Sequence, residues 1–155
     1  MNRAEELNQK ALDTYKQLDD DFLFDEAKVS DEQIRDSENP FNRAFYLSQE
    51  DHLTKVYGEL IVAYYSLKAE LKTFIAVRKT QIKVENDEKG VKTPGNEILE
   101  DTAKAEVSEL YKIVLILEGW VTRVENSTRT CRNHTFGGDR EQKENVKDAR
   151  ETKDR

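Results

Sequence analysis

The chain has 155 residues, of which 37% are charged and 36% hydrophobic, and its formal net charge is −7 at pH 7. This length is typical of one domain, and the polar composition suits long amphipathic helices with solvated faces. A single cysteine, Cys131, excludes an internal disulfide and a cysteine-based zinc cluster. Because the chain has no apolar leader and no apolar run approaching about 18 residues, we expect a cytoplasmic protein with no membrane contact.

The negative charge is concentrated in the first third of the chain. Residues 1–51 carry a net charge of −8, whereas residues 52–155 carry +1. An evenly acidic chain would argue against nucleic acid as a partner, but the larger part of this chain is near neutral and holds local basic patches. The composition therefore leaves nucleic acid binding open.

Residues 1–47 are predicted to form an acidic N-terminal helix and a linker. Apolar residues at helical spacing predict a short helix over 3–18, whose thin apolar face has to pack on the rest of the chain. Residues 27–40 are polar and acidic and predict a linker, either without regular structure or with a helical turn from Ser30. The aromatic run 41–47 predicts either a strand or an extra helical turn.

Acidic residues bracket three large apolar residues in the segment 19–26, which are Phe22, Leu23 and Phe24. The favoured interpretation is a loop whose aromatic residues attach the first helix to the body of the protein. The alternative is a docking peptide for a basic surface on another protein. An EF-hand is excluded because Phe24 stands where that loop needs glycine.

The longest amphipathic pattern begins at Ser48, where Asp51 three residues later gives a start signal like a capping box. Apolar residues then recur at alternating steps of four and three, which is typical of a helix packed on another helix in a coiled coil. The pattern runs through Val84, and Gly90 is the natural left-handed residue after the last turn. Its apolar seam consists of Leu53, Tyr57, Leu60, Tyr64, Leu67, Leu71 and Phe74.

A second long helix is predicted to open with Thr93 as its N-cap and Pro94 at its first helical position. Because the connection to the preceding helix is short, the two helices should form an antiparallel hairpin. The seam of the second helix consists of Leu99, Ala103, Leu110, Ile113, Leu117, Trp120, Val124 and Cys131.

Residues 113–117 are apolar on every side of this helix, which is more than one partner helix covers. Either the first helix covers the remainder or other subunits do, and we expect a homo-oligomer built on this region. A buried strand of five residues is a weaker alternative. The residues predicted to form the core and the oligomer interface are Leu60, Tyr64, Leu67, Leu71, Phe74, Leu110, Ile113, Leu117 and Trp120.

The predicted fold is therefore all-α. An elongated helical hairpin over 48–136 forms the core, the acidic N-terminal region precedes it, and Gly137-Gly138 ends its order. Residues 139–155 are almost entirely charged or amide residues, so 137–155 are predicted to be a disordered charged tail.

The sequence contains no Walker loop, no dinucleotide-binding glycine motif and no nucleophile elbow. Its only histidines, His52 and His134, lack the neighbours of a metal-binding motif. Cys131 lies on the seam and is expected to be a small buried hydrophobe. We therefore predict that the protein is not an enzyme and needs no metal and no cofactor.

A basic line lies beside the apolar seam of the first long helix. At 100° per residue its members fall close together, with Glu59, Glu70 and Glu88 on the opposite flank. We call this line the lysine edge and define it as Tyr65, Lys68, Lys72, Lys79 and Lys83. Arg78 stands on the seam itself, where it either pairs with an acid across the interface or escapes to solvent.

Two interpretations of the lysine edge stay open. It is either a solvated flank that forms salt bridges with acids of the second helix or another subunit, or a surface for single-stranded nucleic acid. In the second case the lysines supply salt-dependent attraction to phosphates and Tyr65 stacks a base. A second small basic patch is formed by Arg129, Arg132 and His134.

Residues of about 60–135 resemble the phage recombination mediator family, the UvsY-like proteins. The points of similarity are the basic helix over 68–83, the connection Gly90-Val91-Lys92-Thr93-Pro94-Gly95-Asn96-Glu97-Ile98, and the long helix that follows. The resemblance implies an all-helical ring, in a phage protein of the host cytoplasm, that binds single-stranded DNA without sequence preference. It also places the DNA-contacting residues before the connecting loop, at Arg78, Lys79 and Lys83.

The leading hypothesis is a non-enzymatic mediator of DNA recombination. The resemblance implies that such a protein helps a recombinase to form a filament on single-stranded DNA covered by single-strand-binding protein. The acidic N-terminal third departs from what a DNA binder prefers and suits a protein partner better. The alternative is a helical adaptor or inhibitor without nucleic acid binding.

Overall fold

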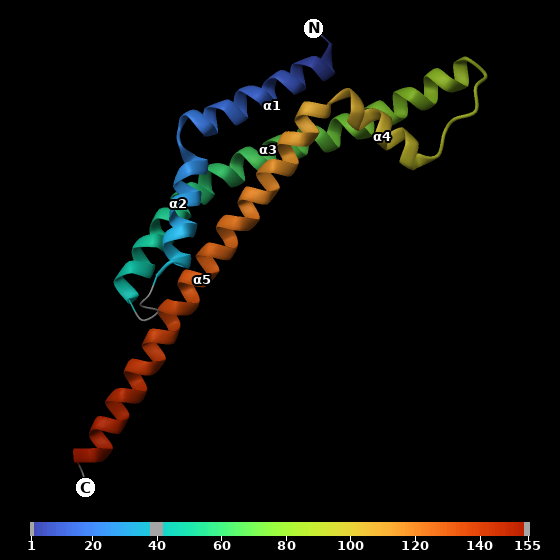
Figure 1. The fold of residues 1–155 in the computed structure, drawn as a ribbon. Coiled ribbons are helices and arrows are strands. Elements are labelled where there is room, and N and C mark those ends of the chain that lie inside the picture. The colour runs from blue at the N-terminus through green and yellow to red at the C-terminus, as the bar shows by residue number, and fades with distance from the viewer. Residues whose placement is uncertain (1, 38–41, 154–155) are drawn as a thin grey trace. The chain divides into compact units, whose positions relative to one another are not determined.

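The computed structural model describes residues 2–37 and 42–153, with side chains described as far as residue 135. Within that part of the chain every regular element is a helix, which confirms the predicted all-α class (Figure 1). The helices are α1 (Arg3–Asp20), α2 (Leu23–Arg35), α3 (Arg43–Glu88), α4 (Asn96–Glu106) and α5 (Ser108–Lys153).

The helices are grouped into two compact units. Unit 1 consists of Met1–Asp21 and Leu60–Trp120, and unit 2 consists of Phe22–Glu59 and Val121–Arg155. Unit 1 thus contains α1, the C-terminal part of α3, α4 and the first turns of α5. Unit 2 contains α2, the N-terminal part of α3 and the remainder of α5.

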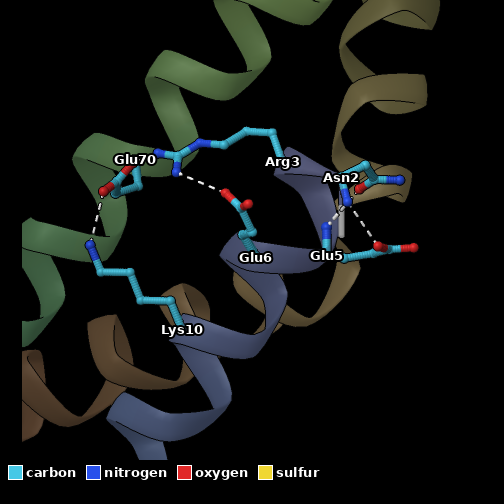
Figure 2. Close-up of polar contacts among 6 residues, drawn as sticks. All are labelled: Asn2, Arg3, Glu5, Glu6, Lys10 and Glu70. Atoms are coloured by element: carbon cyan, nitrogen blue, oxygen red, sulfur yellow. Dashed lines mark hydrogen bonds and ion pairs between the residues drawn. The ribbon is translucent and has the colours of Figure 1, made fainter.

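The first helix, α1, begins after a complete capping box. The side chain of Asn2 accepts a hydrogen bond from the backbone N–H of Glu5, and the Asn2 backbone N–H donates to the Glu5 carboxylate, both at 2.9 Å (Figure 2). These two bonds satisfy backbone and side-chain groups that a helix start otherwise leaves to water. The buried face of α1 consists of Leu7, Ala11 and Leu18.

The second helix, α2, occupies a segment where a loop and a linker were predicted. Its buried residues recur at helical spacing, so the segment has an apolar face that the polar composition had concealed. Phe22 separates it from α1 with a left-handed backbone, φ 58°, and a side chain that is 65% exposed. The buried residues of α2 are Leu23, Phe24, Ala27, Ser30 and Ile34.

The long helix α3 begins five residues before the predicted start at Ser48. Asn42 caps it, because its side-chain oxygen accepts a hydrogen bond from the Phe45 backbone N–H at 3.1 Å. Of the two alternatives for the aromatic run, the extra helical turn is confirmed from Arg43 onward. Phe41 lies outside the described residues.

The end of α3 was predicted correctly at Gly90. This glycine has φ +65°, and its N–H donates to the carbonyl of Asp87 at 3.1 Å. The N–H of Val91 donates to the carbonyl of Asn86 at 2.9 Å. Together the two bonds form a Schellman motif, which favours glycine at the left-handed position.

The second helix of the predicted hairpin is divided into α4 and α5. Gly95, and not Thr93, is the N-cap of α4, so Pro94 lies before the helix. Val107 breaks the helix with φ −116° and ψ 44° while its side chain is fully buried. The break leaves backbone groups without helical partners on both sides. The Asn8 side chain of α1 satisfies two of them.

The end of α5 also differs from the prediction. The helix continues through Gly137 and Gly138 to Lys153, so it does not stop at the glycine pair. The side chains of the predicted tail, 137–155, lie outside the described residues, and its disorder stays a prediction.

In each unit the contacts between helices run antiparallel. In unit 1, Tyr64 on α3 contacts Glu118 on α5, and Arg78 on α3 contacts Glu106 on α4. In unit 2, Glu50 on α3 contacts Arg132 on α5, and Tyr57 contacts Glu125. Residue numbers rise on one helix as they fall on the other, which is the pairing of a helical hairpin.

The apolar seams lie in the cores. Of the run 113–117, Ile113, Val114 and Leu117 are buried, and Leu115 is 49% exposed. The chain itself therefore covers most of this run, and the homo-oligomer stays a prediction. Among the predicted core residues, Phe74 and Trp120 are half-buried, and the buried ones are Leu60, Tyr64, Leu67, Leu71, Leu110, Ile113 and Leu117.

Candidate nucleic-acid interface

The lysine edge lies on the part of α3 that belongs to unit 1. Because α3 is continuous from Arg43 to Glu88, residues separated by four, seven and eleven positions point to similar sides of the helix. Lys68, Lys72, Lys79 and Lys83 are related by these steps. The helix therefore presents them on one side, beside the buried seam.

Three members of the lysine edge are open to solvent. Lys72 and Lys83 are exposed, and within the described part of the chain neither forms an ion pair or a hydrogen bond through its amine. The Tyr65 side chain is 60% exposed. Two unpaired ammonium groups and an exposed aromatic ring are the groups that a phosphate backbone and an unstacked base contact in single-stranded complexes.

Lys68 is partly engaged by unit 1 itself. Its amine donates to the Tyr64 hydroxyl, lies 4.7 Å from the Tyr64 ring centroid and is 3.6 Å from the Glu118 carboxylate. The hydrogen bond with Tyr64, followed by the attraction of Glu118, raises the pKa of Lys68 above its usual value. An anion would therefore compete with Glu118 for this amine.

Lys79 is held more loosely. Its amine lies 4.0 Å from the Glu100 carboxylate on α4, at the limit of an ion pair. Glu100 is bonded more closely to Lys104, at 2.8 Å, and the pKa of Glu100 is lowered by that hydrogen bond. Because Glu100 already has a nearer cation, it binds Lys79 only weakly, but the Lys79 side chain is just 20% exposed.

Arg78 is occupied by carboxylates on both sides. Its Nε donates to both oxygens of Glu106 at 2.9 Å, and a terminal nitrogen donates to Glu85 at 2.7 Å. The side chain is only 23% exposed, and these hydrogen bonds raise the pKa of its guanidinium. Of the two alternatives for this seam residue, pairing with an acid across the interface is the one observed.

One residue of the acidic flank of α3, Glu70, is neutralised by α1. Figure 2 shows the Glu70 carboxylate between Arg3 and Lys10, which reach it from α1 at 2.9 Å each. The hydrogen bond from Lys10 is the main cause that lowers the pKa of Glu70, and Arg3 adds to it. Because these cations compensate Glu70, its carboxylate opposes an anion approaching Lys72 less than a free one would.

The predicted second basic patch lies in unit 2, where its members have different surroundings. His134 stacks on Tyr46 with ring centroids 4.4 Å apart, and the Nε of Arg132 donates to Glu50 at 2.6 Å. Arg129 is exposed and has no ion pair among the described residues. In this patch the His134 ring is therefore stacked on Tyr46, the Arg132 guanidinium is bonded to Glu50, and only the Arg129 guanidinium has no partner in the described part of the chain.

An ion-pair cluster that the sequence did not reveal holds α2 against α5 in unit 2. The Asp31 carboxylate accepts hydrogen bonds from Arg123 at 2.7 and 3.1 Å, from Ser127 at 2.8 Å and from Arg35. Ser127 is 5% exposed, although it is a polar residue. The only sequence signal of this cluster was that Ser127 lies at helical spacing between the seam residues Val124 and Cys131.

Within the described residues, no group of three or more histidine, cysteine or acidic side chains is placed to hold a metal ion. Cys131 is fully buried, and burial followed by the charge of Glu50 raises the pKa of its thiol to about 11. None of the helices in this part of the chain combines the length and apolar character needed to cross a bilayer.

No protein-family model matches this chain, and comparisons with curated proteins and with solved structures found no match. The resemblance to the recombination mediators is therefore a hypothesis that rests on the residues given above.

Proposed function

We propose that this protein binds single-stranded DNA through the lysine edge and takes no part in covalent chemistry. The observation that carries this proposal is that Lys72 and Lys83 share one side of α3, are exposed, and have no carboxylate partner in the described part of the chain. Lys68 precedes them with a partly engaged amine, and Lys79 lies between them with a weakly paired one. Tyr65 supplies an exposed ring for a base.

The mechanism is electrostatic. Each lysine that meets a phosphate releases a counterion, and the logarithm of the binding constant falls with the logarithm of salt concentration by about 0.7 per contact on a single strand. Two unpaired lysines give a slope of about −1.4 per chain, and recruitment of Lys68 and Lys79 raises its magnitude to about 2.8. A single chain therefore binds weakly, and a homo-oligomer would gain affinity by holding one strand at several edges.

The biological role we propose is that of a recombination mediator. Its support is the resemblance of residues 60–135 to the UvsY-like proteins, whose function implies a recombinase and single-strand-binding protein as partners. In this role the protein holds the DNA strand while the recombinase replaces the single-strand-binding protein on it. Recombinase filament formation on covered DNA, with and without this protein, measures that role directly.

The test of DNA binding is a paired charge reversal. Lys72→Glu/Lys83→Glu should lower the affinity for a fluorescent oligo(dT) at low salt, measured by anisotropy, at least about tenfold. The matched control is Lys16→Glu/Lys112→Glu, which makes the same charge change at exposed positions of unit 1 outside the lysine edge. Equal losses in both variants, or no loss in the first, would remove the proposal, provided that circular dichroism shows unchanged helicity.

A second candidate function, a protein-interaction adaptor, is favoured by a groove in unit 2. The groove has a volume of about 430 Å³ and lies between α2 and α3, where Asp25, Glu26 and Val29 contribute to its lining. At its edge the side-chain oxygen of Gln49 is buried and accepts no hydrogen bond. A partner with basic side chains would fit these groups.

The adaptor function predicts that Asp25→Asn/Glu26→Gln abolishes capture of a purified partner while oligo(dT) binding is absent from the wild-type protein. Oligo(dT) binding that depends on Lys72 and Lys83 would instead favour the DNA-binding function.

A further inference from the structure

A second groove in unit 2, with a volume of about 520 Å³, lies between α3 and α5. Thr54 and Tyr57 line it from α3, and Glu125, Thr128, Arg129 and Arg132 line it from α5. Two guanidinium groups therefore share one concave surface with a single carboxylate. The lining residues alone carry a charge of +1, and the Glu50 carboxylate that bonds to Arg132 offsets it, so Arg129 is the guanidinium without a carboxylate partner in the described part of the chain.

The two arginines differ in how many of their N–H groups are already hydrogen-bonded within the protein. Arg129 is exposed and bonds to no side chain in the described part of the chain, so its whole fork of N–H groups is available. Arg132 uses its Nε for Glu50 at 2.6 Å, which fixes the plane of the guanidinium. The terminal nitrogens of Arg132 have no partner among the described residues, so they can serve a ligand.

The other polar groups of the groove do not compete as donors. The Thr54 hydroxyl donates to the carbonyl of Glu50, and the Thr128 hydroxyl donates to the carbonyl of Val124, both at 2.8 Å. The Tyr57 hydroxyl donates to Glu125 at 2.8 Å. Since every hydroxyl proton is used within the protein, the free donors in the groove are the guanidinium N–H groups, which suit an anion with several acceptor oxygens.

Tyr57 distinguishes between possible anions. Its ring is half-buried and lines the same groove, held in place by the bond to Glu125. Inorganic phosphate makes no use of an aromatic ring, whereas the base attached to a nucleotide phosphate gains from contact with one. The arrangement of two arginines around an oriented tyrosine therefore favours a nucleotide unit over a bare phosphate.

We propose that this groove binds a phosphate group of single-stranded nucleic acid, with Arg129 as its principal ligand, Arg132 as the second, and Tyr57 in contact with the adjoining base. The site belongs to unit 2 and does not depend on the lysine edge of unit 1. It gives the chain a second contact point for a strand, built on arginine forks and not on flexible lysines.

The proposal is tested on the full chain by following the arginine Nε–H signals in nuclear magnetic resonance. Pyrophosphate, oligo(dT) and the nucleoside thymidine are added separately. We expect pyrophosphate and oligo(dT) to shift the signals of Arg129 and Arg132, with tighter binding of oligo(dT), and we expect thymidine alone to leave them unchanged.

Substitution then identifies the ligand residue. Arg129→Gln should lower the affinity for pyrophosphate at least about tenfold, as the loss of one charged bidentate contact predicts. Arg129→Lys should give an intermediate loss because it keeps the charge but not the fork. The control Lys55→Gln removes an exposed cation of α3 that does not line the groove, and should have no effect.

The outcomes separate this site from the lysine edge. Lys72→Glu/Lys83→Glu should leave the pyrophosphate-induced shifts of Arg129 intact, whatever it does to oligo(dT) binding. Absence of any shift at Arg129 and Arg132 in the wild-type protein overturns the groove proposal, as does a loss in Arg129→Gln no greater than in Lys55→Gln. Shifts with pyrophosphate but none with oligo(dT) overturn the assignment to nucleic acid.

Discussion

The side-chain oxygen of Asn8 on α1 accepts a hydrogen bond from the backbone N–H of Leu110 on α5, at 3.1 Å. The nitrogen of the same amide donates to the backbone carbonyl of Glu106 at 3.1 Å. One side chain thus satisfies a donor at the start of α5 and an acceptor at the end of α4. The break at Val107 is stabilised from α1, a helix about one hundred residues away along the chain.

Loss of the Asn8 amide should therefore destabilise unit 1. We expect Asn8→Ala to lower the free energy of unfolding by about 1–3 kcal/mol, because two backbone groups lose their partner at a half-buried site. Urea denaturation measures the change. Gln9→Ala, which removes only a bond to Asp13 on the exposed side of α1, should stay within about 0.5 kcal/mol of wild type. Equal stability of Asn8→Ala and Gln9→Ala would contradict the assigned role.

Two glycines should respond in opposite directions to replacement by alanine. Gly90 has φ +65° at the end of α3, so Gly90→Ala should cost about 1 kcal/mol. Gly119 is helical, and an added methyl group meets no atom within 4 Å, so Gly119→Ala should stabilise by up to about 1 kcal/mol. Thermal melting of both variants checks the pair, and a gain in Gly90→Ala would show that the Schellman motif does not control the end of α3.

Substitution of Arg78 should mainly lower the stability of the fold, whereas substitution of Lys83 should mainly lower the affinity for DNA. Arg78→Gln leaves Glu85 and Glu106 without their shared cation and should lower the free energy of unfolding by about 1–3 kcal/mol. Lys83→Gln should change it by no more than about 0.5 kcal/mol, because the amine has no partner in the described chain. For oligo(dT) affinity in the folded proteins we expect the larger loss in Lys83→Gln. The reverse order would identify Arg78 as the DNA contact.

The Asp31 cluster predicts a loss of stability in acid. Burial acts to raise the pKa of Asp31, but hydrogen bonds from Arg123, Ser127 and Arg35 outweigh it and hold the pKa below the usual 3.8. A carboxyl whose pKa is lowered by folding stabilises the protein above its unfolded pKa. The contribution is therefore present above pH 3.8 and is lost as the pH falls through the lower folded value.

Asp31→Asn should remove this contribution, so its urea midpoint should fall below that of wild type at neutral pH and approach it as the pH drops below 3.8. Glu32→Gln, at an exposed neighbour without a partner in the described chain, is the control and should follow the wild-type pH profile. A constant difference between Asp31→Asn and wild type at all pH values would refute the coupling.

Cys131 should be unreactive in the folded protein. Its thiol is fully buried and its pKa is raised to about 11, so little thiolate forms at neutral pH and reagents have no access. In the native protein we expect Ellman's reagent to modify Cys131 at a rate limited by local or global unfolding. In denaturant we expect it to react at the rate of a free thiol. Modification of native protein at the speed of a free thiol would show that α5 does not bury this residue.

The sequence by itself determined most of the helical elements. The seven-residue recurrence from Leu53 to Leu67 specified a buried stripe on α3, since only a helix brings such residues to one side. Gly90 specified the end of α3, because few other residues adopt its left-handed backbone without strain. The lysine edge followed from the same periodicity, as side chains on a helix keep a fixed angular relation.

Only the tertiary structure decided which polar groups are free and where long helices break. Arg78 and Lys83 look alike in the sequence, but carboxylates of α3 and α4 occupy the first and none in the described chain reaches the second. The break at Val107 depends on Asn8, which no local pattern relates to it. Local periodicity fixes the direction of a side chain, whereas the partner that it meets depends on which distant segments pack beside it.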